Sequence, residues 1–212
     1  MQLYHSLRPH PRVGAGREVR MFLHEKGIDV AKVDVDMLSS ENRSAGFLAK
    51  NPSGQLPALE LDDGRVIGES VAICELLEEH CPCPALIGST PEERALTRMW
   101  LRRIEFGITE NIVNGWRFAE GQAFWATRGR TVPEAAAGLK AIARDKLAWL
   151  DGLMEGKTFV VGERFTLADI VLFVGLDFAE VVGQPLDPQL TRLAAWRTTV
   201  GERASAIASL SA

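Results

Sequence analysis

Two short segments, about a dozen residues apart, carry groups that could hold a peptide. Pro57 stands directly before the apolar run ALEL at residues 58–61, where a ring without an N–H forfeits a hydrogen bond of a sheet. A trans Pro57 at a sheet edge is the commoner alternative. A cis bond between Leu56 and Pro57 would instead turn the Leu56 N–H and C=O out of the sheet. An extended ligand could then pair with them as an added strand does.

The second segment, Glu69–Ser70, stands at the start of a helix pattern. Free N–H groups and the positive end of the helix dipole favour a carboxylate there, and Ser70 adds a hydroxyl donor. Glu69 supplies negative charge for an ammonium group. The pair therefore suits a zwitterionic amino-acid head, whereas a simple helix cap is the alternative when the pair is considered alone.

The first 80 residues alternate strand and helix patterns that would position both segments. The strands are expected at residues 2–5, 30–36, 58–61 and 65–67, and the helices at 19–26, from Ser39 or Ser40 to before Pro52, and at 69–80. Strands joined by a helix pair in parallel with a right-handed crossover, and an Asp-Gly hairpin adds antiparallel edges. We therefore predict a four-stranded mixed sheet in an α/β, thioredoxin-like domain over residues 1–82.

Helix signals replace strand signals after residue 84. Thr90, Thr131 and Thr166 each stand at a capping position with an acidic residue three positions later, which is typical of a helix start. The first cap begins a long pattern that runs toward Glu120. Three caps predict at least three helices, so we expect an all-α domain over residues 89–212.

Charge and cysteine content exclude several classes of function. The net charge is −4, and the 24 basic residues are scattered, which argues against a nucleic-acid partner. No apolar run approaches the roughly 20 residues that span a bilayer, and the first residues lack an apolar signal core, so we expect a cytoplasmic protein with no membrane partner. Cys81-Pro-Cys83 lacks a second pair of ligands, so we expect no metal site.

Three motifs together resemble those of a cytosolic glutathione S-transferase: NPSGQLP at residues 51–57, Glu69–Ser70, and FTLAD at 165–169. The resemblance covers essentially the whole chain. It implies that the first domain binds glutathione, that the helical domain covers the electrophile, and that the protein is a homodimer. By motif match, glutathione would contact the residues Gln55, Leu56 and Pro57 at its cysteinyl backbone, Glu69 and Ser70 at its γ-glutamyl end, and Arg43 at its glycyl carboxylate.

The chain departs from the family near residue 10. Members normally carry Tyr, Ser or Cys after the first strand, and this side chain favours the glutathione thiolate. None occupies that slot here, and residues 13–16 look like an insertion. The chain resembles an atypical bacterial and fungal subgroup that manages with a helix N-terminus and a bound water. We name Ser6, His10 and Arg12 as the catalytic candidates, with an exposed turn as the alternative for His10.

The electrophile pocket is expected late in the long helix. Trp116, Arg117 and Phe118 suit an apolar substrate, although an aromatic stripe at helical spacing is also typical of a core. The resulting hypothesis is a glutathione transferase in detoxification, which lowers the thiol pKa of glutathione and directs the thiolate onto an electrophilic carbon or a peroxide. The alternative is a non-catalytic glutathione-binding or regulatory module. A thiol-disulfide reductase would need a cysteine at the start of the first helix, where this chain has none.

Overall fold

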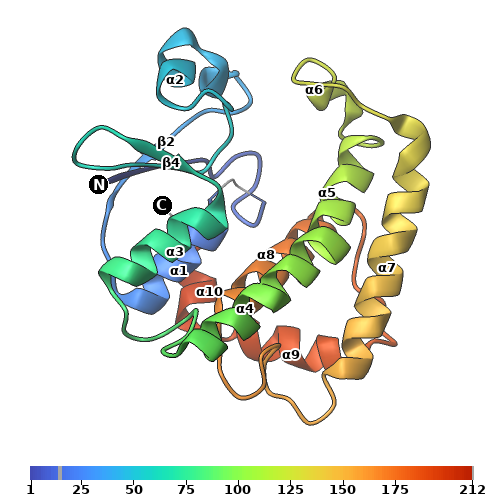
Figure 1. The fold of residues 1–212 in the computed structure, drawn as a ribbon. Helices are drawn as coiled ribbons and strands as arrows, with labels where there is room; N and C mark the ends of the chain where they lie inside the picture. Colours follow the sequence, from blue (N-terminus) through green and yellow to red (C-terminus); the bar gives the residue numbers. More distant parts are fainter. Residues whose placement is uncertain (14–15, 212) are drawn as a thin grey trace. The chain divides into compact units, whose positions relative to one another are not determined.

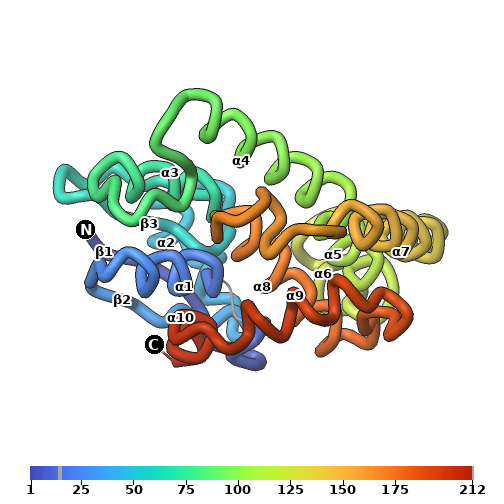
Figure 2. Tube along the Cα trace, turned by 90° about the horizontal axis from the view of Figure 1, so that it is seen from below, coloured from blue at the N-terminus to red at the C-terminus, as the bar shows by residue number. Residues whose placement is uncertain are grey.

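The computed structural model describes residues 1–13 and 16–211, which form two compact units. The first unit contains Met1–Ser89 together with the C-terminal segment from Gly201, and the second contains Thr90–Val200. The boundaries expected from the sequence placed the C-terminal segment in the helical domain. It packs with the first unit because its helix α10 (Ala204–Ala208) lies against α1 (Arg17–Lys26), as Figure 2 shows.

The first unit is built on the predicted four-stranded mixed sheet (Figure 1). Its strands are β1 (Gln2–His5), β2 (Ala31–Asp34), β3 (Ala58–Glu60) and β4 (Val66–Gly68), in the order β2-β1-β3-β4. The β1–β2 pair is parallel, and the β1–β3 and β3–β4 pairs are antiparallel. This topology confirms the thioredoxin-like prediction. The two segments that could hold a peptide stand directly before β3 and directly after β4.

Helices cover both faces of this sheet. On one face, α1 and α3 (Ser70–His80) pack over the sheet, and α2 (Ala45–Lys50) lies on the other (Figure 1). Under α2, the rings of Tyr4 and Phe47 meet edge to face with centroids 5.8 Å apart. Alternation along β1 explains this arrangement, because adjacent residues such as Leu3 and Tyr4 point to opposite faces.

The predicted cap of α2 is wrong. Ser44 caps the helix by accepting the Phe47 N–H at 3.3 Å, and a 3₁₀ turn at Glu41–Arg43 precedes it. The helix starts later than predicted because the Asp36 carboxylate accepts the N–H groups of Leu38 at 2.9 Å and of Ser39, one of the two predicted caps, at 3.2 Å. An aspartate that satisfies nearby backbone donors stabilises a turn in place of a helix.

The second unit is entirely helical. Its elements are α4 (Pro91–Ile104), a π-helical turn (Glu105–Thr109), α5 (Glu110–Arg117), α6 (Gln122–Trp125), a 3₁₀ turn (Pro133–Ala135), α7 (Ala136–Leu153), α8 (Leu167–Val181) and α9 (Thr191–Gly201). The Thr90 capping box is confirmed, since Thr90 accepts the Glu93 N–H at 3.2 Å and Glu93 accepts the Thr90 N–H at 3.4 Å. Thr131 does not cap α7, because the 3₁₀ turn intervenes.

The long helix predicted from Thr90 toward Glu120 is interrupted by the π-helical turn. Asn111 bends back to donate to the carbonyls of Phe106 at 2.7 Å and Gly107 at 3.0 Å. Side-chain bonds to backbone carbonyls satisfy groups that the regular ladder releases. The helix then ends at Arg117, three residues before the predicted end.

The third predicted cap encloses a buried carboxylate. Asp169 accepts the N–H groups of Thr166 and Val160 and the indole Nε1–H of Trp196, each at 2.9 Å. Burial raises the pKa of Asp169 above its ordinary value, and these hydrogen bonds oppose that rise. Asp169 therefore joins three separate segments of the helical unit.

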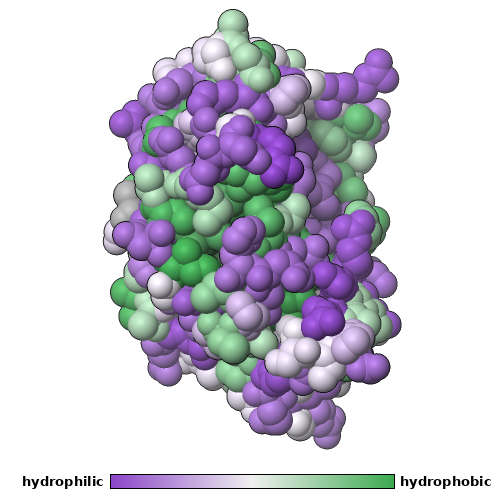
Figure 3. Space-filling model, turned by 60° about the vertical axis from the view of Figure 1, so that its left-hand side comes forward, coloured by the Kyte–Doolittle hydropathy of each residue, from purple (hydrophilic) through white to green (hydrophobic). Residues whose placement is uncertain are grey.

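Hydrophilic residues surround separate hydrophobic patches on the face drawn in Figure 3. Within residues 1–13 and 16–211, every helix is too short or too polar to span a bilayer.

Candidate functional site

The loop before β3 is held in shape by two buried asparagines. Asn51 donates from Nδ2 to the Gln55 carbonyl at 2.9 Å, and its own carbonyl accepts the Gly54 N–H at 2.9 Å. Asn42 donates to the Gly54 carbonyl at 2.7 Å. The Leu56–Pro57 bond that follows is cis, which confirms the cis alternative of the sequence analysis and excludes the trans one. The loop therefore reaches Leu56 in a fixed conformation.

The backbone of Leu56 is unpaired in the described part of the chain. Neither its N–H nor its C=O bonds to any of residues 1–13 or 16–211. Strand pairing stops short of it, because the last pair of β3 and β4 joins Ala58 to Gly68. Unpaired backbone groups require a partner, and an extended peptide supplies one acceptor and one donor.

Ser70 and Leu56 lie at the same end of the β3–β4 strand pair. Each lies two residues beyond the Ala58–Gly68 pair of the antiparallel ladder, and paired strands are roughly 4.8 Å apart. Among the described residues, no group bonds to the Ser70 hydroxyl. The first N–H groups of α3 also lack intrahelical acceptors. An anion acceptor therefore stands beside the open edge of Leu56.

Glu69 holds an uncommon backbone conformation that starts α3. Its φ is 64° and its ψ is 119°, a region that costs a non-glycine residue about 1–3 kcal/mol. Its carbonyl accepts the first intrahelical bond, from Ile73 at 3.0 Å, while the side chain is exposed. The chain thus turns sharply from β4 into α3, with a carboxylate next to the helix N-terminus.

The N-terminus of α1 meets the same loop. Gly16 has a φ of 88°, and a Cβ built on it would lie 3.1 Å from the Cβ atoms of both His5 and Pro57. Only glycine combines this φ with such close approach. The open edge of Leu56, the start of α3 and the start of α1 are therefore gathered in one unit.

Two buried arginines lie beneath the start of α1. Arg20 donates from Nη1 to Nδ1 of His5 at 3.1 Å and from Nε to the Ser209 carbonyl at 3.0 Å, while Arg17 donates to the Ala206 carbonyl at 3.4 Å. Burial, followed by repulsion from Arg17, lowers the pKa of Arg20 to about 10. The Arg20 side chain therefore stays cationic at neutral pH.

His5 remains neutral in this environment. Burial, followed by the charge of Arg20, lowers the pKa of His5 to about 4, and its side chain is 1% exposed. A neutral ring can accept the Arg20 hydrogen bond through Nδ1, whereas an imidazolium cannot. Sequence reasoning missed these three residues, because the partners of Arg17 and Arg20 lie in α10 and directly after it, 189 residues away, and His5 in turn bonds to Arg20.

The three catalytic candidates lie in the segment before α1. Ser6 is fully buried and accepts the Arg8 N–H at 3.3 Å. His10 is exposed, and its Nδ1 accepts the Arg12 N–H at 3.1 Å, which matches the alternative of a turn residue. Residues 14 and 15 of the expected insertion lie outside the described residues. The catalytic roles therefore stay predictions.

Arg43 braces the loop that carries Leu56. It donates to the Ser53 carbonyl at 3.2 Å and lies against Gly54, where a Cβ would be 2.8 Å from its Nη1. Its buried Nε has no hydrogen-bond partner in the part of the chain that is described. Gln55 beside it is exposed. Arg43 therefore retains a donor, as contact with an anion would require.

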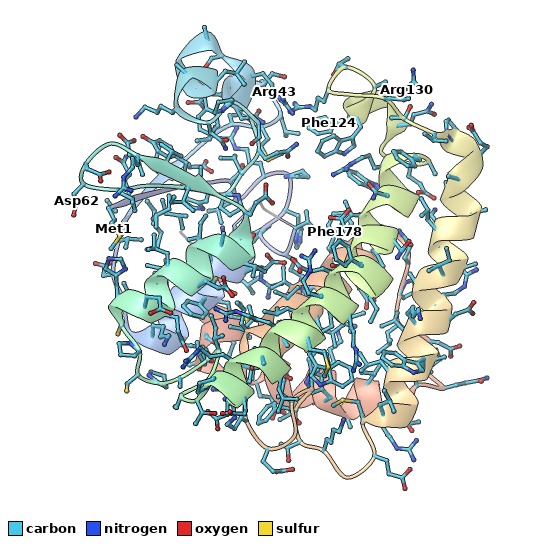
Figure 4. All side chains as sticks on the ribbon, in the orientation of Figure 1. Met1, Arg43, Asp62, Phe124, Arg130 and Phe178 are labelled. Carbon is cyan, nitrogen blue, oxygen red and sulfur yellow. The ribbon has the colours of Figure 1, made fainter. Side chains whose placement is uncertain are left out.

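The residues expected at the electrophile pocket join a cluster of aromatic and cationic side chains in the helical unit. The ring of Trp116 meets Phe178 edge to face, with centroids 5.5 Å apart, and the Arg117 guanidinium stacks 4.1 Å from the Trp125 ring centroid. Figure 4 shows Phe178 along the same side of the unit as Phe124 of α6. The sequence reasoning missed α6, whose four residues give little periodic signal.

Two buried donors in this cluster have no acceptor. Arg117 Nε and Trp125 Nε1 both lack hydrogen-bond partners among residues 1–13 and 16–211, although Arg117 Nη1 donates to Asn114 at 2.9 Å. Burial lowers the pKa of Arg117 below its ordinary value, which Glu110 partly opposes. Phe118, the third predicted residue, is half-buried at the end of α5. The cluster therefore offers flat apolar surface together with donors.

In the described part of the chain, no three His, Cys, Asp or Glu side chains gather as metal ligands would.

Residues 16–80 match the glutathione S-transferase N-terminal domain family, and residues 133–199 match the corresponding C-terminal domain family. Glutathione S-transferase 2 of Saccharomyces cerevisiae is 31% identical over 193 residues, which cover 88% of this chain and 81% of that protein.

Two further relatives agree over most of their length. Maleylacetoacetate isomerase of Pseudomonas aeruginosa is 31% identical over 205 residues, covering 89% of both chains. A crystal structure of a glutathione S-transferase domain-containing protein from Marinobacter aquaeolei VT8 is 34% identical, covers 97% of this chain and 99% of that one, and superposes with a TM-score of 0.89. The chain therefore belongs to the glutathione S-transferase family and is a glutathione transferase.

Proposed function

We propose that this transferase binds glutathione along the backbone of Leu56, lowers the pKa of its thiol, and directs the thiolate onto an electrophilic carbon or a peroxide. The observation that carries the proposal is the unpaired N–H and C=O of Leu56 next to Ser70. The cysteinyl residue of glutathione would exchange two hydrogen bonds with Leu56, as an added strand does. Gln55 and Pro57 would border this residue.

The two ends of glutathione would meet opposite groups of the loop and of α3. The γ-glutamyl carboxylate would accept from the Ser70 hydroxyl and the N–H groups of α3, and the ammonium would face Glu69. The glycyl carboxylate would meet the guanidinium of Arg43, whose buried Nε has no hydrogen-bond partner among the described residues. In this arrangement each charged group at the two ends of the tripeptide faces a protein group of complementary charge or hydrogen-bonding character.

The thiolate would be stabilised at the start of α1. Because Gly16 lies against Pro57, a thiol next to Leu56 faces the positive end of α1. The buried charges of Arg17 and Arg20 add to this field. Ser6, His10 and Arg12 remain the candidates for direct contact with the sulfur, and none is required for the helix terminus to act.

The electrophile would be held by Trp116, Arg117 and Phe118. The rings of this cluster can contact an aromatic ring, and Arg117 Nε and Trp125 Nε1, which lack acceptors among the described residues, can donate to a nitro, carbonyl or carboxylate oxygen. An electrophile that combines a flat apolar body with an oxygen acceptor therefore fits best. Detoxification of such compounds in the cytoplasm is the role that we propose.

A homodimer is proposed from the apolar surface of the helical unit. Phe106 is 61% exposed, and Ile142 and Trp149 on α7 are 46% and 43% exposed. Large apolar side chains exposed together mark interaction surfaces. Sedimentation equilibrium should give a dimer that Trp149→Glu dissociates, and a wild-type monomer at micromolar concentration would contradict this proposal.

The test of the function is an ultraviolet titration of the glutathione complex. Thiolate absorbance should appear about two pH units below the free thiol's pKa, and each unit corresponds to about 1.4 kcal/mol of differential stabilisation. Ser70→Ala should weaken glutathione binding about tenfold, the cost of one hydrogen bond to a charged group, and Ser39→Ala, a change in an exposed turn, should leave it unchanged.

Three outcomes separate the candidate functions. Thiolate absorbance only near the free thiol's pKa would disprove activation. Retention on immobilised glutathione without turnover of any aryl halide, epoxide or hydroperoxide would favour the non-catalytic module. Absence of binding would refute the site at Leu56.

A further inference from the structure

We propose that the segment Cys81-Pro-Cys83 is a redox-sensitive modification site, at which glutathione disulfide oxidises the two thiols to an intramolecular disulfide. The segment directly follows α3 and belongs to the first unit. Both cysteines are free thiols, Cys81 partly exposed and Cys83 exposed. None of the residues proposed to contact glutathione or the electrophile belongs to the segment, so this inference does not rest on the proposed function.

The two thiols are close enough to form a disulfide. Residues two positions apart have Cα atoms at most about 7 Å apart, and a disulfide joins Cα atoms that are roughly 4.4–6.8 Å apart. The Cys81 side chain already folds back over the segment, because its Sγ donates to the Cys83 carbonyl oxygen at 3.6 Å. Closing the bond therefore needs side-chain rotation and a small adjustment of the main chain.

The main chain on both sides of the two thiols is anchored from the interior. Lys26 of α1 is fully buried, pairs with Glu78, and donates to the Cys81 carbonyl at 2.8 Å and to the Pro84 carbonyl. Glu78 in turn accepts the Ile87 N–H at 2.8 Å. This buried ion pair holds the backbone of the segment, so the two thiols are presented together toward solvent.

Accessibility separates these thiols from the third cysteine, Cys74. Its side chain is 0% exposed. Burial, followed by the negative charges of Glu18 and Glu78, raises the pKa of Cys74 well above its ordinary value. Because the thiolate is the species that attacks a disulfide, Cys74 stays a protonated core thiol. The chain therefore contains its own unreactive control.

The oxidation takes place in two exchange steps. The Cys83 thiolate, which is the more accessible one, attacks one sulfur of glutathione disulfide. The bond between the two glutathione sulfurs breaks, a bond between Cys83 and one glutathione forms, and the other glutathione leaves as a thiolate. The Cys81 thiolate then attacks Cys83 and releases the second glutathione. The protein loses two electrons and two protons, and one glutathione disulfide becomes two molecules of glutathione.

Oxidation would loosen the buried anchor. The ring closed by the disulfide contains the carbonyl carbon of Cys81, whose oxygen accepts from Lys26. Closing the ring turns this carbonyl, so the buried ammonium of Lys26 loses an acceptor, which destabilises the folded chain. The disulfide offsets little of this loss, because its effect on the unfolded chain is small for so short a loop. The unfolding temperature should therefore fall by about 3 °C or more.

The experiment incubates the full reduced chain with glutathione disulfide and follows the product by intact mass and peptide mapping. Cys81→Ser removes the thiol that releases glutathione, and Cys83→Ser removes the thiol that is attacked first, with Cys83→Ala as a second version. Cys74→Ala is the matched control at the buried thiol. Ser70→Ala, which weakens the proposed glutathione site, should be oxidised at the wild-type rate, so failure of that site leaves this test intact.

We expect the wild type to lose two hydrogens through a bond between Cys81 and Cys83 that dithiothreitol reverses. Cys81→Ser should instead retain one glutathionyl group on Cys83. Cys83→Ser should react at least about tenfold more slowly, because the remaining thiol is less accessible, whereas Cys74→Ala should behave as the wild type. The proposal is overturned if the wild type forms no such bond, if Cys81→Ser retains no glutathionyl group, or if full oxidation leaves the unfolding temperature unchanged.

Discussion

Acidification should destabilise the first unit through His5. The ring is buried beside Arg20, and these two effects lower the pKa of His5 to about 4, from 6.5. Above pH 6.5 the ring is neutral in the folded and unfolded states, so protonation of His5 does not lower the free energy of unfolding. As the pH falls, the unfolded state takes up the proton first, and stability is lost until the folded-state pKa near 4 is reached.

The size of this loss follows from the two pKa values. Between pH 7 and pH 5 the single site changes the free energy of unfolding by about 1.8 kcal/mol, from the linkage relation with 1.36 kcal/mol per pKa unit. Within this window the pKa of Glu25 adds little. Burial would raise that pKa, but hydrogen bonds from Arg203 and Ser205 hold it below 4.5.

Urea unfolding at pH 7 and pH 5 measures the loss. His5→Asn places an amide near Nδ1 that accepts from Arg20 but does not titrate, so the decrease between the two pH values should shrink by about 1.8 kcal/mol. His10→Asn changes an exposed ring and should leave the decrease as in the wild type. The reasoning is refuted if His5→Asn retains the full pH dependence, or if wild-type stability is flat across this range.

Three substitutions test other parts of the structure. Asn51→Ala releases the loop that presents Leu56, so calorimetry should show about a tenfold loss of glutathione affinity, and an unchanged affinity would mean that the loop needs no such support. Asp169→Ala strands the buried Trp196 indole and two backbone N–H groups, which should cost about 3–5 kcal/mol in urea unfolding. A cost below about 1 kcal/mol would contradict the bonding of Asp169. Arg117→Gln should raise the KM of a nitroaryl electrophile about tenfold with glutathione affinity unchanged, and an equal rise for an electrophile without an oxygen acceptor would argue against an Arg117 contact.

The sequence was most informative where signals are local. The Asp-Gly hairpin, the glycine at the end of α1 and the Thr90 cap each depend on residues within a few positions of one another. They were found in the structure as expected. The prediction of the α2 cap failed because two neighbouring serines, Ser39 and Ser40, gave equal signals. The Asp36 carboxylate, which accepts nearby backbone N–H groups, determines where the helix starts.

Interactions between distant segments could not be read from the sequence. Arg17 and Arg20 look like ordinary surface residues of a helix, but their partners are carbonyls of the C-terminal segment. For the same reason α10 was assigned to the helical domain. The π-helical turn depends on the Asn111 amide reaching back along its own helix, which no periodic pattern reveals.

The candidate site was predictable in part. Leu56 and Ser70 stood out because a proline and a helix start each leave backbone groups without partners. Their alignment at one edge depends on the β3–β4 register, which the hairpin turn sets. His10 drew attention by residue type alone, and the structure places it in an exposed turn.

Hydrogen exchange at the Leu56 amide tests the central claim most directly. The amide has no partner in the described chain, so it should exchange rapidly in the free protein and slow at least about tenfold when glutathione saturates the site, because a hydrogen bond of about 1.4 kcal/mol or more then protects it. The neighbouring exposed Gln55 amide, which already bonds to Ser53, should change little. Rapid exchange of Leu56 in the saturated complex would contradict the proposed binding mode.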